Sequence, residues 1–319
     1  VLPRGATLTF AHAALTPVLR SRELDAISGA RLSFKAEHLQ RSGAFKFRGA
    51  SNAVFGRDDA DARRGVVTHS SGNHGAALAL AAHLRRIPCH VVVPQGAVAT
   101  KLAAIASYGA VLHHCEATLA AREAMCEQVR VATGARVVHP YTHPDVIAGQ
   151  GTVGLEIAEQ VAELGLTTAD VIVNCSGGGL TSGIALALEA KAPGLRVRTA
   201  EPEGFDDAAR SVASGNRERN LKLTGSICDA ILSPELGQNT FPVIKRLCGP
   251  GLVVSDDEAL SAMAEAFTRL KLVLEPGGAA SLAAALYRAD EIEGETVIVV
   301  ASGGNTDAAM FNRALAKAV

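Results

Sequence analysis

The sequence predicts an α/β protein built on mostly parallel β-sheets, and two observations lead to this fold class. Short apolar runs rich in β-branched residues recur along the 319 residues, and most precede an Ala- and Leu-rich stretch of helical composition. The apolar runs are continuous rather than alternating, which is typical of strands covered on both faces of a sheet. Strands that alternate with helices indicate parallel strands joined by crossover helices.

The expected elements follow one another along most of the chain. Strands are predicted at Gly65–Thr68, His90–Val93, Arg136–Val138, Val171–Val173, Val197–Thr199 and Val297–Val300. Helices are predicted at Gly75–His83, Ala97–Ser107, Gly151–Leu164, Leu180–Ala190 and Asp307–Lys317. The most polar stretch, Ser214–Lys222, is expected to be a surface loop. Because ligands of open α/β sheets bind at the carboxyl ends of strands, the Gly- and Ser-rich loops after strands are the places to look for a site.

Composition and charge exclude several classes of protein. The chain is 48% hydrophobic and 20% charged, as in ordinary globular proteins, and its length suggests about two domains of ~150 residues. A formal net charge of −1, few aromatic residues and no block of basic residues argue against nucleic-acid binding. No apolar run reaches the ~18 residues of a membrane span, so we expect a cytoplasmic protein without membrane contact.

The cysteines predict neither a zinc site nor disulfides. They form no CxxC pair and share no spacing with histidines, as zinc ligands would. We expect buried free thiols of a reducing compartment. The six are Cys89, Cys115, Cys126, Cys175, Cys228 and Cys248.

One candidate for chemistry is a lysine between two aromatic residues. In the segment Ser42–Gly49, Lys46 stands between Phe45 and Phe47. Aromatic neighbours would desolvate the ammonium group and lower its pKa, as an imine-forming lysine requires. The alternative is a surface lysine beside two core phenylalanines.

A second candidate, Thr68-His69-Ser70-Ser71-Gly72-Asn73-His74-Gly75, follows a predicted strand and opens a helix. Backbone N–H groups at a helix start can bind a carboxylate or a phosphate. The alternative is ordinary N-capping, since Ser and Asn are favoured at that position.

A third candidate, Cys175–Gly183, holds three consecutive glycines directly after a strand. Without Cβ atoms the backbone can wrap an anion and donate several N–H groups to it. The loop also nearly matches a dinucleotide fingerprint, with Gly177, Gly179 and Ser182 in the glycine positions and Glu201 after the next strand. That match leaves a nicotinamide-dependent oxidoreductase as the rival interpretation.

The fourth pattern, Ala301-Ser302-Gly303-Gly304-Asn305, also follows an apolar strand, where a serine can hydrogen-bond to the ring nitrogen of a heterocycle. In this order the four patterns resemble the serine/threonine dehydratase and serine racemase family of fold-type II pyridoxal-phosphate enzymes. The resemblance covers nearly the whole chain and extends to His139-Pro140, Val146–Thr152 and Leu274-Glu275-Pro276. It explains Lys46 and the Ser-Ser-Gly-Asn-His loop, which the oxidoreductase interpretation does not.

The resemblance implies a fold like that of the tryptophan synthase β subunit, with two open, twisted, mostly parallel sheets flanked by helices. It implies a large cofactor-binding domain of residues 1–64 plus 142–319 and a small mobile domain of residues 65–141.

The resemblance also implies the residues that bind pyridoxal 5′-phosphate. Lys46 forms the internal Schiff base and Phe45 packs beside the ring. The other cofactor residues are Asn73 at the ring hydroxyl, Gly177, Gly178, Gly179 and Leu180 at the phosphate, Ser302 at the pyridine nitrogen, and Glu275. A neutral serine hydroxyl cannot hold the ring nitrogen protonated, so the electron sink is weak and elimination of a β-leaving group is the expected chemistry.

For the substrate, the resemblance implies that the amides of Ser70, Ser71, Gly72, Asn73 and His74 bind the α-carboxylate. Lys46 takes the Cα proton, and Ser71 matches a second acid/base on the opposite ring face, so racemisation is chemically possible. Arg122 matches an arginine on the substrate side. Tyr141 stands where serine racemases have Asn, and His143 is a candidate partner for a distal carboxylate.

The segment Glu201–Asp207 resembles the divalent-cation loop of the family. Glu201, Asp207 and the carbonyl of Phe205 are the implied ligands, and oxygen ligands suit Mg²⁺ or Ca²⁺. The alternative is a loop that is merely rich in acidic residues.

These observations lead to a lyase that dehydrates and deaminates a 3-hydroxy amino acid such as L-threonine or L-serine to a 2-oxo acid and ammonia. A threo-3-hydroxyaspartate dehydratase and a serine racemase with side dehydratase activity are the alternatives, and the nicotinamide-dependent oxidoreductase is a remote one. A pyridoxal-phosphate carrier without catalytic activity is disfavoured by the presence of Lys46 and Ser71. The family resemblance implies a homodimer.

Overall fold

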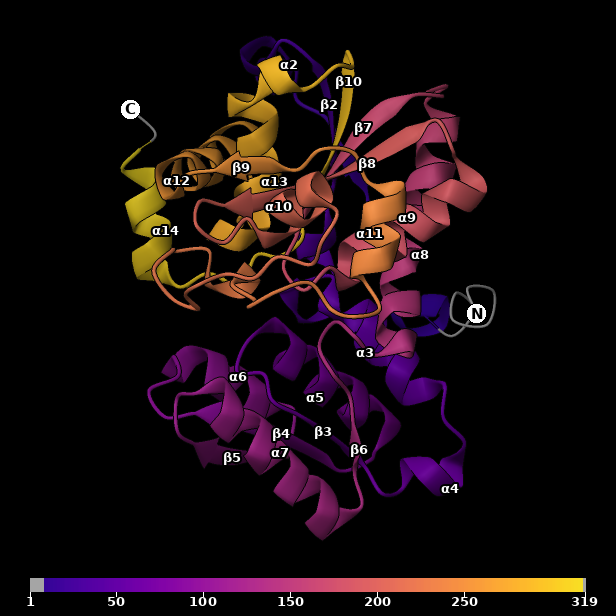
Figure 1. The fold of residues 1–319 in the computed structure, drawn as a ribbon, viewed down its shortest axis with the longest axis vertical. Helices are drawn as coiled ribbons and strands as arrows, with labels where there is room; N and C mark the ends of the chain where they lie inside the picture. The colour runs from indigo at the N-terminus through magenta and orange to yellow at the C-terminus, as the bar shows by residue number, and fades with distance from the viewer. Residues whose placement is uncertain (1–8, 318–319) are drawn as a thin grey trace. The chain divides into compact units, whose positions relative to one another are not determined.

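A computed structural model describes residues 9–317 of the chain (Figure 1). The described chain divides into two compact units, unit 1 with residues 9–14 and 46–149 and unit 2 with residues 15–45 and 150–317. Each unit has its own mostly parallel sheet flanked by helices, so the predicted fold class is confirmed. The segment 65–141, predicted as the small domain, lies inside unit 1.

Unit 1 has a four-stranded sheet in the order β5-β4-β3-β6, and all its strand pairs are parallel. Its strands are β3 (Val66–Thr68), β4 (Cys89–Pro94), β5 (Val111–Cys115) and β6 (Arg136–Val137). Its helices are α3 (Lys46–Phe55), α4 (Asp59–Ala62), α5 (Asn73–Arg85), α6 (Ala99–Ser107) and α7 (Leu119–Thr133), and α8 (Pro144–Glu163) begins in it. Val91 and Val93 pack with α5 on one face, while Val92 packs with α7 on the other. A continuous apolar strand such as β4 thus contributes side chains to the cores on both faces of the sheet.

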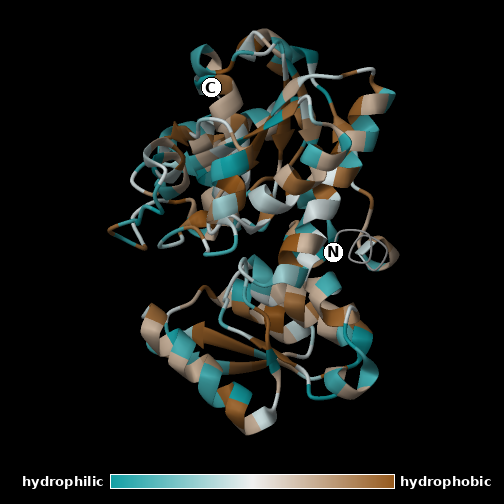
Figure 2. Ribbon diagram, turned by 45° about the vertical axis from the view of Figure 1, so that its right-hand side comes forward, coloured by the Kyte–Doolittle hydropathy of each residue, from teal (hydrophilic) through white to brown (hydrophobic). Residues whose placement is uncertain are grey.

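Unit 2 has a six-stranded sheet in the order β1-β2-β10-β7-β8-β9, parallel except for β1. The strands are β1 (Val18–Leu19), β2 (Arg31–Lys35), β7 (Ala169–Asn174), β8 (Leu195–Pro202), β9 (Leu252–Val254) and β10 (Thr296–Val300). The helices are α2 (Arg22–Ser28), α9 (Gly179–Lys191), α10 (Asp207–Ser214), α11 (Phe241–Leu247), α12 (Asp256–Glu265), α13 (Pro276–Tyr287) and α14 (Ala308–Leu315). Ile172 faces the core under α12 and α13, and its neighbours Val171 and Val173 face α8 and α9. Figure 2 shows these apolar strands in brown between helices with polar outer faces.

All six predicted strands and all five predicted helices are present, with ends that differ by a few residues. The largest difference is α8, which begins at Pro144 rather than Gly151. Residues 215–222 form the expected exposed loop, in which Leu221 is fully accessible. Within residues 9–317, no helix combines the length and apolar character needed to cross a membrane. The six cysteines are free, and five of them are buried, as predicted.

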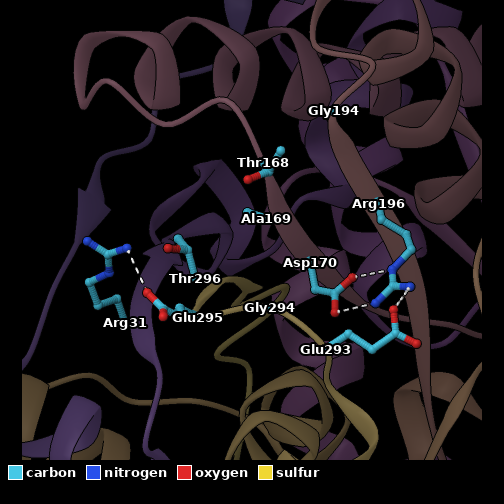
Figure 3. Close-up of a pocket in the computed structure, with 10 residues that line it drawn as sticks. All are labelled: Arg31, Thr168, Ala169, Asp170, Gly194, Arg196, Glu293, Gly294, Glu295 and Thr296. Carbon is cyan, nitrogen blue, oxygen red and sulfur yellow. Dashed lines mark hydrogen bonds and ion pairs between the residues drawn. The ribbon is translucent and has the colours of Figure 1, made fainter.

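A pocket of about 430 Å³ lies at the amino-terminal ends of β7, β8 and β10 in unit 2 (Figure 3). Its charged groups are paired with one another: Arg196 donates to the buried Asp170 at 2.6 Å and to Glu293 at 2.8 Å. None of the residues predicted for the site lines this pocket. Because active sites of such sheets lie at the carboxyl ends of strands, we assign the pocket no part in the chemistry.

A buried polar network joins the start of unit 2 to α8. The Lys35 ammonium, at the end of β2, donates to Glu156 Oε2 at 2.5 Å, to Gln160 Oε1 at 2.9 Å and to the Thr16 carbonyl at 2.7 Å. Lys35 and Glu156 are almost fully buried. A buried charge without its partner is strongly destabilising, so each of these two residues depends on the other.

The substitution Lys35→Met is therefore expected to lower the free energy of unfolding by about 3–5 kcal/mol, because it removes the ammonium that pairs with the buried Glu156 carboxylate. Denaturant unfolding measures the change. The double variant Lys35→Met/Glu156→Leu, which removes both charges, should recover most of the loss. A single variant as stable as the wild type would contradict this account of the network.

Candidate active site

In unit 1, Lys46 is the first residue of α3, and its Nζ donates to the carbonyl of Pro140 at 3.3 Å. The lysine side chain is half-buried. Phe47 is completely buried in the core beneath α5, while Phe45 is half-buried and packs on the α8 and α9 side of unit 2. The two phenylalanines thus belong to different cores, and Lys46 sits where the chain passes from one unit to the other.

The Ser-Ser-Gly-Asn-His loop leads from β3 directly into α5. The N-cap residue of α5 is Gly72, and no side chain caps the helix there. The alternative of ordinary N-capping by a serine or asparagine is therefore not what the structure contains. A Cβ on Gly75 would lie 2.0 Å from the Ser70 carbonyl oxygen, so glycine is needed for this close turn. The first N–H groups of α5 lie at the end of this loop, and residues 70–73 are half-buried.

Three histidines surround Lys46 and Arg122 in unit 1, and burial holds them neutral. It lowers the pKa of His74 well below its usual value, with the Lys46 charge adding to the effect, and His74 Nε2 lies 3.0 Å from the Val138 carbonyl. Burial, with His69 and Lys46, lowers the pKa of His139 to about 4. Burial and the Arg122 charge lower the pKa of His69. The histidines of this cluster therefore add little positive charge near neutral pH.

Arg122 lies in the first turn of α7 and is half-buried. Its Nε is buried and has no hydrogen-bond partner among the described residues. A solvated surface arginine would expose that atom to water, so the structure disfavours this alternative. A buried guanidinium donor without a partner is an open position for an anion.

His139 shapes the loop that carries Tyr141. Its Nδ1 accepts the N–H groups of Tyr141 and Thr142 at 3.4 and 3.3 Å, and the Tyr141 ring packs edge-on against it at 4.6 Å. His143 instead accepts the N–H of Asp145 at 3.2 Å at the start of α8. The sequence motifs contained His69 and His139 but gave them no role. His143 is the predicted partner of a distal carboxylate, and its Nδ1 instead accepts a backbone N–H at the helix start.

In unit 2 the glycine loop joins β7 to α9. Gly178 is the N-cap of α9 with φ +84°, and no side chain caps this helix either. A Cβ there would lie 2.7 Å from Ile244 and 2.8 Å from Thr240 Oγ1, so only glycine fits. Thr240 Oγ1 also donates to the Gly177 carbonyl at 2.7 Å and fixes the loop. The uncapped N–H groups at Gly179 and Leu180 form a ready anion site.

Ser302 lies just beyond the carboxyl end of β10 and is buried. Its Oγ accepts a hydrogen bond from Asn174 Nδ2 at 2.9 Å, which leaves the hydroxyl proton to be donated. Glu275, the N-cap residue of α13, is buried beside Gly303, where a Cβ would lie 2.1 Å from its Oε1. Asn174, 128 residues from Ser302, was not predicted.

The proposed cation loop holds two buried carboxylates. Glu201 accepts the N–H groups of Ala208 and Ala209 at 2.9 and 2.8 Å, and burial with the nearby Asp207 raises its pKa well above the usual value. Asp207 Oδ1 accepts from Asn220 at 2.6 Å, while its Oδ2 is buried without a partner in the described chain.

Burial raises the pKa of Asp207 to about 7, which a divalent cation would reverse. No cluster of three or more His, Cys, Asp or Glu side chains in residues 9–317 has the arrangement of a metal site, so any cation here would also need backbone or water oxygens.

The same contacts argue against a dinucleotide site. In that interpretation Glu201 would bind a ribose hydroxyl. Glu201 is instead fully buried, so a ribose cannot reach it. An amide at the start of α10 donates to each of its oxygens, and the second lone pair of each oxygen could bind only a small ion.

Comparison with known proteins shows which family this chain is similar to. The family model for pyridoxal-phosphate dependent enzymes matches residues 10–303. A serine racemase of Oryza sativa is 44% identical, with 95% of this chain and 89% of the relative covered. A β-hydroxyaspartate dehydratase of Paracoccus denitrificans is 42% identical, with 93% and 92% covered. The solved structure of maize serine racemase superposes with a TM-score of 0.90 at 40% identity and covers 99% of this chain and 96% of that one.

Proposed function

Because this chain belongs to the family of pyridoxal-phosphate-dependent enzymes, we propose that its preferred substrate is a 3-hydroxy amino acid with a second carboxylate, such as L-threo-3-hydroxyaspartate. The chain is an enzyme of the class that removes water and ammonia from hydroxy amino acids. The observation that carries the choice of substrate is the buried, unpartnered Nε of Arg122 beside His69. L-threonine and L-serine lack the second carboxylate that would form an ion pair with this guanidinium.

The described residues fit pyridoxal phosphate. The side chains of Ile244 and Thr240 leave room only for glycine at Gly178, so the chain can turn there into the uncapped start of α9, which would hold the phosphate. The Ser302 hydroxyl has a proton free to donate to the pyridine nitrogen, and Asn73 would contact the ring hydroxyl. Lys46 would hold the cofactor covalently, beside Phe45. When bound, the cofactor supplies an electron sink for bond breaking at the substrate Cα.

The chain's own residues would then carry the elimination. The amides of residues 70–74 would bind the α-carboxylate at the uncapped start of α5. Lys46 would take the Cα proton, and the β-hydroxyl would receive a proton as its bond to Cβ breaks and leave as water, so that one proton is removed and one is delivered. The guanidinium of Arg122 would hold the distal carboxylate and so fix the Cβ substituents. The released enamine hydrolyses to a 2-oxo acid and ammonia.

Racemisation is the second candidate activity of the same residues. The observation that favours it is that Ser71 does not cap α5, because Gly72 occupies that position. The Ser71 hydroxyl is therefore available as the second acid/base. Tyr141, held by His139, stands where the racemases that the sequence resembles have Asn, which favours elimination over racemisation of serine.

We further propose that Glu201, Asp207 and the Phe205 carbonyl bind Mg²⁺ or Ca²⁺. The supporting observation is that Asp207 Oδ2 is buried without a hydrogen-bond partner in the described chain. A cation would coordinate this oxygen and offset the repulsion between the two buried carboxylates. The cation would order the loop after β8 rather than take part in the chemistry. A cytoplasmic homodimer remains our prediction for the working state of the enzyme.

Side-by-side assays of 2-oxo acid release test the substrate. The wild type should have a kcat/KM for L-threo-3-hydroxyaspartate at least about tenfold above that for L-threonine, equivalent to about 1.4 kcal/mol. Arg122→Met should lower kcat/KM for hydroxyaspartate by about tenfold or more, mainly through a higher KM. It should change kcat/KM for threonine by less than about threefold. The control His143→Gln should keep the wild-type preference. Equal losses on both substrates, or a wild type that prefers threonine, would refute the role of Arg122.

Thermal unfolding of the holoenzyme tests the cation loop. Mg²⁺ at about 100 times its Kd should stabilise the wild type by about 2.7 kcal/mol and raise Tm. Asp207→Asn should remove this response, because it deletes the anionic ligand at the orphan oxygen. Glu203→Gln, an exposed carboxyl of the same loop, should respond as the wild type does. If Mg²⁺ stabilises the Asp207 variant equally, the ion binds elsewhere.

A further inference from the structure

Two histidines of unit 1, His90 and His113, lie outside the candidate active site and have no part in the proposed reaction. His90 is on β4 and His113 on β5, the edge strand of the small sheet. The parallel register pairs His90 with Val111 and Val92 with His113, so the two histidines are diagonal neighbours on one face. Both are partly exposed, so ions from solvent can reach them.

The ring nitrogens of the pair are already close. His90 Nδ1 lies 3.1 Å from His113 Nε2, with the ring centroids 5.3 Å apart and the planes tilted by 45°. At this distance one nitrogen donates a single proton to the other. Burial lowers the pKa of both rings, and the His113 ring lowers that of His90 further. No carboxylate contributes to either shift, so both imidazoles are neutral near pH 7 and can offer lone pairs to a metal.

We propose that His90 and His113 form a two-imidazole site for a divalent transition-metal ion, Zn²⁺ or Cu²⁺, whose remaining positions are filled by water. Zn–N bonds are about 2.0–2.1 Å, so two nitrogens bound to one ion at roughly 90–110° stand about 2.9–3.4 Å apart. The observed 3.1 Å separation falls in this range. The ion would lie to one side of the line between the two nitrogens and displace their shared proton, so the imidazole rings would turn toward it while the strands stay in place.

The chemistry separates this site from the cation loop. Neutral imidazoles favour Zn²⁺, Cu²⁺ and Ni²⁺, whereas the oxygen ligands of the Glu201 loop favour Mg²⁺ or Ca²⁺. A metal at His90 and His113 would join the edge strand β5 to β4 through side chains as well as through the backbone ladder. Its expected effect is therefore on the stability of unit 1 and not on the reaction.

Titration of the holoenzyme with Cu²⁺, in excess Mg²⁺ to occupy oxygen sites, tests the proposal. Electron paramagnetic resonance should show a species bound through two imidazole nitrogens in the wild type. His90→Gln and His113→Gln should each raise the Kd of that species by about tenfold or more. His114→Gln is the matched control, since it alters the adjacent, exposed histidine on the opposite face of β5 and should leave the Kd within about twofold.

Thermal unfolding with Zn²⁺ gives an independent measurement. Zn²⁺ should raise Tm of the wild type and of His114→Gln and leave Tm of the other two variants unchanged. Melts without metal show whether each variant folds. Copper binding and zinc stabilisation that survive in His90→Gln and His113→Gln, or that are lost in His114→Gln, would overturn the proposal. Binding at the histidines near Lys46 would appear equally in all variants and would count against it.

Discussion

Both units contain a helix that follows the carboxyl end of a strand and begins with a glycine in place of a capping side chain. Gly72 precedes α5 in unit 1, and Gly178 precedes α9 in unit 2. A capping serine or aspartate would satisfy one of these N–H groups and stabilise a helix, relative to glycine, by about a few tenths of a kcal/mol. Neither helix has that stabilisation, and in the proposed function the two helix starts bind the carboxylate of the substrate and the phosphate of the cofactor. The other residues of the proposed reaction would act on ligands held at these two helix starts.

Electrostatics in unit 1 complements the helix starts. Burial keeps His69, His74 and His139 neutral, so they orient their neighbours without adding charge. The guanidinium of Arg122 carries the lasting positive charge and is assigned to the far end of the substrate. Lys46 is assigned to the proton at Cα, a role that requires its neutral amine. A neutral His139 is also required for the Tyr141 loop, because a protonated Nδ1 could not accept the two N–H groups that now point at it.

The strands with continuous apolar residues, such as β7 and β10, were predictable because burial on both faces leaves a local signature. The edge strand β5 was missed because Val111–Cys115 carries two histidines, and α13 because Pro276–Tyr287 begins with two glycines. Site residues held in local motifs, Lys46 and the glycine loop among them, were predictable in the same way. The Asn174 contact to Ser302 and the orphan oxygen of Asp207 depend on segments far apart in the chain, and no local pattern contains them.

Lys46 is the residue on which the proposed chemistry converges, and its replacement by alanine is the most direct test. Wild type and Lys46→Ala are compared for the visible absorbance of bound pyridoxal phosphate and for 2-oxo acid release from L-threo-3-hydroxyaspartate. The variant is expected to fold, to lose the imine absorbance and to form no product, because the covalent attachment and the base at Cα are removed together. Turnover that persists in Lys46→Ala would contradict this role of Lys46.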